Sequence, residues 1–125
     1  MEKKDVITEK SFDFSIKIVR LVQQLQSEKK EFALSKQLLR SGTAIGALVS
    51  EAKFGQSDAD FLSKMYIALK EANETVYWIQ LLYSTDYLNK EQFEDINRDS
   101  KELLAILVAI TKTLKEKIKN NANKR

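Results

Sequence analysis

The sequence contains no cysteine, no histidine and no proline, and only three of its 125 residues are glycine. Without cysteine the chain has no disulfide framework and no thiol chemistry, which favours a reducing cytoplasm as its location. Without histidine it lacks the commonest general base, the usual zinc ligand and the Glu-x-x-His pattern of di-iron bundles. The sequence therefore predicts no enzyme, no catalytic residue, no metal ligand and no cofactor, and we expect no small-molecule substrate.

Long apolar runs and a secretory leader are missing as well. The longest uncharged run is Thr75–Thr85, whereas a membrane-spanning helix needs about 20 apolar residues. The first ten residues, MEKKDVITEK, are charged and lack the apolar segment of a signal peptide. We therefore expect no membrane partner and a single cytoplasmic domain over residues 1–125, which is long enough to bury one hydrophobic core.

Charge is distributed unevenly along the chain, whose net charge is +3. Residues 112–125 carry six basic side chains and one acidic side chain, which gives this segment a charge of +5. The other 111 residues carry 15 basic and 17 acidic side chains, a charge of −2. A basic segment can bind phosphates, whereas lysines near the end of a helix also complement its dipole. Both interpretations stay open at this point.

Apolar residues recur at spacings of three and four, and strand-like alternation is absent, so the sequence predicts an all-α fold. We expect four helices with frayed termini, over about residues 11–27, 33–54, 58–83 and 89–119. Gly55 is placed to act as the C′ residue of the second helix. Ser57 and Asn89 are predicted N-caps, because each has a suitable partner three positions later. The short connections predict an up-down-up-down four-helix bundle.

The predicted second helix has two faces without charge at their centres. One stripe is expected to face the core, and it consists of Leu38, Gly42, Ile45, Val49 and Ala52. The opposite stripe should be polar if it met water. It consists instead of Arg40, Ala44, Ala47 and Glu51. Because the centre of this second stripe is small and uncharged, we expect it to contact another chain.

The predicted third helix carries apolar side chains on an otherwise charged outer face. The residues concerned are Ile67, Glu71, Glu74 and Trp78. Aromatic anchors are enriched in protein interfaces, although Trp78 is also explained as a residue at the edge of the monomer core. With the small stripe on the second helix, these residues form the predicted oligomer interface. Arg40 lies at one end of the small stripe, and Glu51, Glu71 and Glu74 lie elsewhere on these faces. Ion pairs between them are expected to join neighbouring chains and set their register.

Two further patterns concern charge. Lys101, Lys112, Lys115 and Lys119 fall within about 60° of each other on the outside of the predicted fourth helix. This set, here called the basic stripe, is the candidate site for RNA or DNA, and a symmetric oligomer would multiply its contacts. The three carboxylates near Arg40 offer an alternative, a carboxylate metal enzyme that uses Glu51, Glu71 and Glu74. Nearby basic residues favour an ion-pair network instead.

Two blocks of the sequence resemble a known bacterial family. The first is QLLRSGTAIGALVSEA, residues Gln37–Ala52, and the second is DFLSKMYIALKEANETVYWIQLL, residues Asp60–Leu82. They closely resemble the four-helix-bundle proteins called S23 or 23S rRNA intervening-sequence proteins, over roughly residues 12–117. Many relatives have Ser, Asn and Glu in place of Ala44, Leu48 and Ser50.

The resemblance implies a four-helix bundle that assembles into a homopentameric ring. A similar bundle is the accessory variability protein of diversity-generating retroelements, a basic pentamer that binds nucleic acid and a reverse transcriptase. No enzymatic activity is established for the family. By analogy the resemblance implies RNA or DNA as a partner beside other copies of the chain. The alternative is a structural protein-interaction module that binds no nucleic acid.

Overall fold

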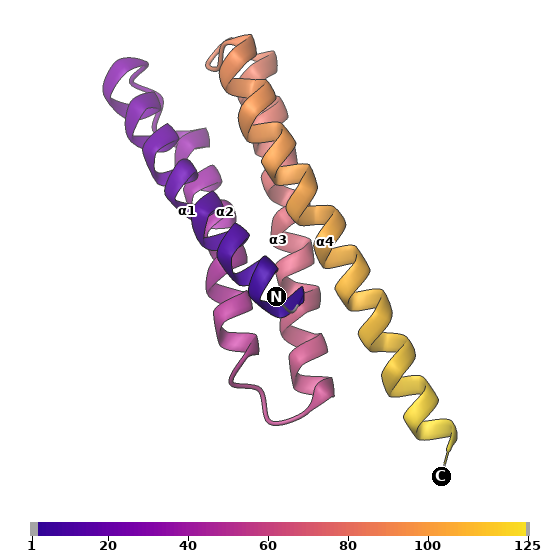
Figure 1. Ribbon diagram of the computed structural model, residues 1–125. Helices are drawn as coiled ribbons and strands as arrows, with labels where there is room; N and C mark the ends of the chain where they lie inside the picture. The colour runs from indigo at the N-terminus through magenta and orange to yellow at the C-terminus, as the bar shows by residue number, and fades with distance from the viewer. Residues whose placement is uncertain (1–2, 125) are drawn as a thin grey trace.

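The computed structural model describes residues 3–124 and contains four helices, which run up and down in turn (Figure 1). Their bounds are Lys3–Glu28 for α1, Ala33–Ala52 for α2, Asp58–Ser84 for α3 and Lys90–Asn123 for α4. Each helix packs against the next one along the chain, and α1 also contacts α4. Within residues 3–124 there is no strand. The predicted all-α four-helix bundle is therefore confirmed.

The first and last helices are longer than predicted. The first begins at Lys3 and not at residue 11, because Ile7 and Ser11 are both buried and continue the inward stripe by one more turn. The last continues to Asn123, since neither proline nor glycine interrupts it. Residues 120–123, which were predicted to fray, are therefore helical, while residues 1, 2 and 125 lie outside the described part of the chain.

Of the helix-end residues predicted at the two connections around α3, two N-caps are confirmed and one C′ residue is wrong. The Ser57 side chain accepts a hydrogen bond from the Asp60 backbone N–H at 3.1 Å, as an N-cap should. Asn89 and Gln92 form a complete capping box at the start of α4. The prediction for Gly55 is wrong, because α2 ends at Ala52 and none of the described glycines has a positive φ.

The glycines of α2 allow α1 to approach closely. The predicted inward stripe of α2 is confirmed, since Leu38, Gly42, Ile45, Val49 and Ala52 are all buried. A Cβ atom added at Gly42 would lie 2.9 Å from Cγ1 of Ile18 on α1. One added at Gly46 would lie 3.2 Å from the backbone oxygen of Ser11. Both glycines therefore serve the packing of α1 on α2.

The fourth helix reaches beyond the rest of the bundle. In Figure 1 it runs past the connection between α2 and α3, and the chain ends there. Lys117 is level with the start of α3, because its Nζ atom lies 3.4 Å from Oδ2 of Asp58. Among the helices within residues 3–124, none is long and apolar enough to cross a membrane.

Candidate oligomer interface

The antiparallel packing of α2 on α3 brings the predicted interface residues onto one outer surface. Arg40 on α2 is level with Glu71 and Glu74 on α3 and forms ion pairs with both. At the far end of the same surface, Glu51 on α2 lies 3.5 Å from Nζ of Lys64 on α3. The surface, here called the α2–α3 face, consists of Arg40, Ala44, Ala47, Glu51, Ile67, Glu71, Glu74 and Trp78.

These ion pairs correct one expectation from the sequence. Arg40 was expected to pair with carboxylates of a neighbouring chain, and the structure places its partners in its own chain. The reason is register: two antiparallel helices joined by a short connection bring positions 40 and 71 to the same level. The pairs therefore hold α2 against α3.

The cluster around Arg40 is tightly hydrogen-bonded. Nη1 of Arg40 lies 3.0 Å from Oε2 of Glu71, and its Nη2 bonds to Oε1 of Glu74. The indole N–H of Trp78 donates to the same Glu74 oxygen at 3.0 Å. The Arg40 hydrogen bond, with a smaller contribution from Trp78, holds the pKa of Glu74 below its usual value. Two carboxylates share one guanidinium, so the cluster keeps a net negative charge.

Between the two ion-paired ends, the α2–α3 face is uncharged and partly open. Ala47 is exposed, Ala44 is half-buried, and the Ile67 side chain is 43% exposed. Trp78 is half-buried and packs against the core, with Tyr77 edge-on to its ring at 5.2 Å. Trp78 thus lies at the edge of the monomer core, and part of its surface remains open on this face.

The three carboxylates named for a metal site do not form one. Glu71 and Glu74 share Arg40, whereas Glu51 pairs with Lys64 at the other end of the face. In the described part of the chain, no group of three or more Asp and Glu side chains is arranged to hold a metal ion.

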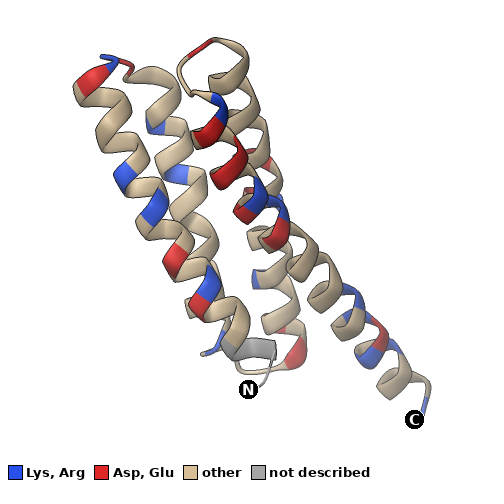
Figure 2. Ribbon diagram, turned by 45° about the horizontal axis from the view of Figure 1, so that its top comes forward, with Lys and Arg blue, Asp and Glu red and all other residues tan. Residues whose placement is uncertain are grey.

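The basic stripe on α4 is free of ion pairs. Its four members are all exposed, and none of them has an ionic partner among the side chains of residues 6–124. Figure 2 shows basic residues gathered along the C-terminal part of α4, where the helix extends past its neighbours. Val108, 48% exposed, interrupts the stripe between Lys101 and Lys112. The stripe is therefore available to an anionic partner.

One exposed apolar surface, on α1, was not predicted from the sequence. Phe12, Ile16 and Val19 on α1 are 66%, 40% and 37% exposed. Their spacing of four and three places them on one side of the helix, next to its buried stripe. The signal was present as a second set of apolar residues shifted from the core positions, and the continuous core stripe of the same helix obscured it.

Comparison with known proteins agrees with this architecture. A family model described as 23S rRNA-intervening sequence protein matches residues 3–109. A crystal structure of a protein of unknown function from the S23 ribosomal protein family, from Bacteroides thetaiotaomicron, aligns with a TM-score of 0.87 and 52% sequence identity. The alignment covers 89% of this chain and 99% of that chain. Comparison with curated proteins found no match.

Proposed function

The chain belongs to the 23S rRNA-intervening sequence protein family, and on this premise we propose that it is a non-catalytic assembly protein. Its copies associate through the α2–α3 face into a cyclic homo-oligomer, a pentamer by resemblance to related bundles. The observation that carries the proposal is the composition of this face. Its centre is small and apolar with Ala44, Ala47 and Ile67, and it lies open on the single chain.

Intramolecular ion pairs support this role without bridging two chains. They lie at the two ends of the apolar centre and link α2 to α3 there. Interfaces typically have such a dry centre with charged groups at the rim. A cytoplasmic location stays a prediction that the lack of cysteine favours.

The mass of the native assembly tests this proposal. Multi-angle light scattering and native mass spectrometry of the wild-type chain should give a closed oligomer at tens of micromolar. Changing Ala47→Arg places a long charged side chain in the centre of the face and should shift the mass to that of a monomer. Ala109→Arg, at an exposed alanine of α4, is the matched control and should leave the mass unchanged. A monomeric wild type would refute the proposal.

A second candidate function, binding of RNA or DNA, is favoured by the unpaired state of the basic stripe. Each chain offers few cations, so a single copy should bind weakly, while a ring gains through multivalency. Phosphate contacts release counterions, and affinity for single-stranded RNA should therefore fall with salt, by a slope of about 0.7 for each phosphate neutralised. Without such binding, the protein is a purely structural interaction module.

Fluorescence anisotropy with a labelled single-stranded RNA tests the second candidate. The triple change Lys112→Glu, Lys115→Glu and Lys119→Glu should abolish binding. As a control of equal charge, Lys29→Glu, Lys30→Glu and Lys53→Glu alters exposed lysines elsewhere on the bundle and should weaken binding far less. Affinity that is independent of salt, or equal in the two variants, would exclude the basic stripe as the site.

A further inference from the structure

The outer surface of α1 carries an apolar stripe that is exposed in the described part of the chain. This α1 stripe consists of Phe12, Ile16 and Val19. It lies next to the side of α1 that contacts α2, because Ser11 and Ser15 lie against Gly46. Phe12, at 66% exposed, is among the most exposed aromatic residues of the helices. A contiguous apolar patch of this kind marks a surface that another molecule covers.

We propose that the α1 stripe of one copy docks on the α2–α3 face of a second copy. The inference rests on the proposed function, since it names the other half of the same interface. The two surfaces are complementary in size: the stripe offers a phenyl ring and two branched side chains, and the face offers Ala44 and Ala47. Bulky side chains over alanines allow close packing without a charged group in the contact.

Charge supports the same pairing. Arg20 lies one helical turn beyond Ile16, is exposed, and forms no ion pair with the side chains of residues 6–124. On the α2–α3 face, two carboxylates share the single guanidinium of Arg40. Arg20 of the docking copy supplies the missing positive charge. An unpaired guanidinium beside one apolar surface thus corresponds to a pair of carboxylates that share one guanidinium beside the other.

The lengths of the two surfaces agree as well. Phe12 and Arg20 are about 12 Å apart along α1, and Arg40 and Ala47 are about 10 Å apart along α2, at 1.5 Å per residue. When Arg20 meets the carboxylates near Arg40, Phe12 therefore lies over Ala47. In this register Phe12, the aromatic residue of the stripe, packs on the part of the face with the smallest side chains.

The positions of the two surfaces favour a closed ring. They are different surfaces of one chain, so the contact is head-to-tail. In the bundle α1 neighbours α2, so the two surfaces lie on adjacent and not opposite sides (Figure 1). Contacts on adjacent sides turn each copy relative to the last, and a few copies can close a ring, whereas opposite sides would extend an open row.

Mixing two defective variants tests the pairing. The stripe variant is Phe12→Asp with Ile16→Asp, and the face variant is Ala44→Arg with Ala47→Arg. Each alone should be a monomer with wild-type helicity. Mixed in equal amounts they should form a dimer and nothing larger, because the stripe variant keeps an intact face and the face variant keeps an intact stripe. The control Val108→Asp, at an exposed apolar residue of α4, should assemble as the wild type does.

The possible outcomes separate the two proposals. If the stripe variant assembles normally while the face variant is monomeric, the α1 stripe is not part of the interface and the proposed function stands. If both are monomeric and their mixture stays monomeric, the stripe and the face do not contact each other. If the wild type is itself monomeric, the proposed function fails and this inference fails with it.

A second test avoids charged substitutions, which also bear on folding. The chain has no cysteine, so single engineered thiols report only the contact that they probe. Chains with Phe12→Cys, mixed with tagged chains carrying Ala47→Cys, should form a disulfide-linked heterodimer under mild oxidation. Val108→Cys in place of Phe12→Cys should give at least tenfold less. Equal yields of the two heterodimers would overturn the proposed pairing.

Discussion

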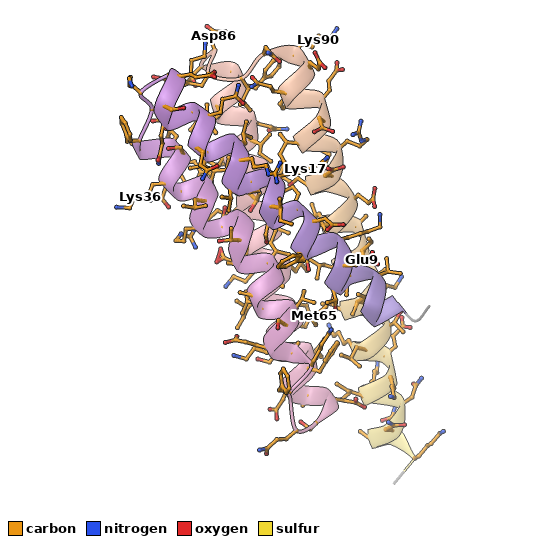
Figure 3. The ribbon with its side chains drawn as sticks, turned by 60° about the vertical axis from the view of Figure 1, so that its left-hand side comes forward. Glu9, Lys17, Lys36, Met65, Asp86 and Lys90 are labelled. Carbon is orange, nitrogen blue, oxygen red and sulfur yellow. The ribbon has the colours of Figure 1, made fainter. Side chains whose placement is uncertain are left out.

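The α2–α3 seam and the α1–α4 seam both carry ion pairs between antiparallel helices, and the two seams differ in what lies beneath those pairs. At the α2–α3 seam, the ion pairs of Arg40 lie above a buried hydrogen bond of 2.9 Å between the hydroxyls of Ser41 and Thr75. At the α1–α4 seam, Lys10 pairs with Glu102 and Lys17 pairs with Asp95 and Asp99. Figure 3 shows Lys17 on the side of α1 that faces α4.

Beneath the α1–α4 pairs lies a hollow bounded by charged side chains and by the core residues Phe14 and Leu103. The contact between α1 and α4 is also the least extensive in the bundle. Exposed ion pairs each stabilise a protein by only about 0–1 kcal/mol. Packing therefore holds α2 against α3, whereas ion pairs make a larger share of the contact between α1 and α4. Ion pairs of the same kind thus matter less at the α2–α3 seam than at the α1–α4 seam.

The largest expected effect concerns the packed seam. Changing Thr75→Val keeps the side-chain shape but leaves the buried Ser41 hydroxyl without its partner. We expect the free energy of unfolding to fall by about 1–3 kcal/mol. Urea titration at a fixed protein concentration measures it, since assembly raises apparent stability. Thr113→Val, at an exposed position of α4, is the control, and an equal effect of both changes would contradict a special role for the buried pair.

The next effect separates the two seams directly. The double change Lys10→Met with Lys17→Met removes the cations that bridge α1 to α4. Arg40→Met removes the cation that bridges Glu71 and Glu74 on α3 to α2. Each lost pair should lower the free energy of unfolding only slightly, because exposed ion pairs are screened by solvent. Hydrogen exchange resolved by helix should show faster exchange in α1 for the lysine variant. In the arginine variant, the amides of α2 and α3 should keep their protection from exchange. Equally faster exchange at both seams would contradict the proposed difference between them.

Alkaline pH should open the charged seam first. The hydrogen bond to Glu102 raises the pKa of Lys10, and the bond to Asp99 raises the pKa of Lys17. A raised lysine pKa means that the stabilisation is complete below the ordinary value of about 10.4 and is lost as the pH rises through the raised value. Arginine stays charged there. The melting temperature of the wild type should fall above pH 10 more than that of the double lysine variant, and parallel curves would contradict this.

The smallest effect lies in the acid range and concerns the other seam. Because Arg40 and the indole N–H of Trp78 lower the pKa of Glu74, its stabilisation is complete above the ordinary glutamate pKa of about 4.3 and is lost as the pH falls through the lowered value. Glu74→Gln should therefore flatten the loss of stability at acid pH by a fraction of a kcal/mol, since the group is partly exposed. Glu94→Gln, on the surface of α4, is the control and should leave the acid dependence unchanged.

Local sequence patterns predict the four helices, two of their N-caps and the inward stripe of α2. These features depend on contacts within a few residues, namely the spacing of apolar side chains and the caps at Ser57 and Asn89. The same patterns also predict which residues of α2 and α3 share an outer face, because helical periodicity places them together. The resemblance of Gln37–Ala52 to a known family pointed to the same bundle.

The partners of the individual side chains depend instead on how the helices pack together. Arg40 pairs within its own chain because α2 and α3 are packed antiparallel in one particular register, and no local pattern reports that register. The extra turns of α1, the close approach of Ile18 to Gly42 and the exposure of Phe12 depend in the same way on how the helices are rotated against each other. Rotation and register arise from packing between distant segments, and so they follow from the folded bundle and not from the sequence pattern of any single helix.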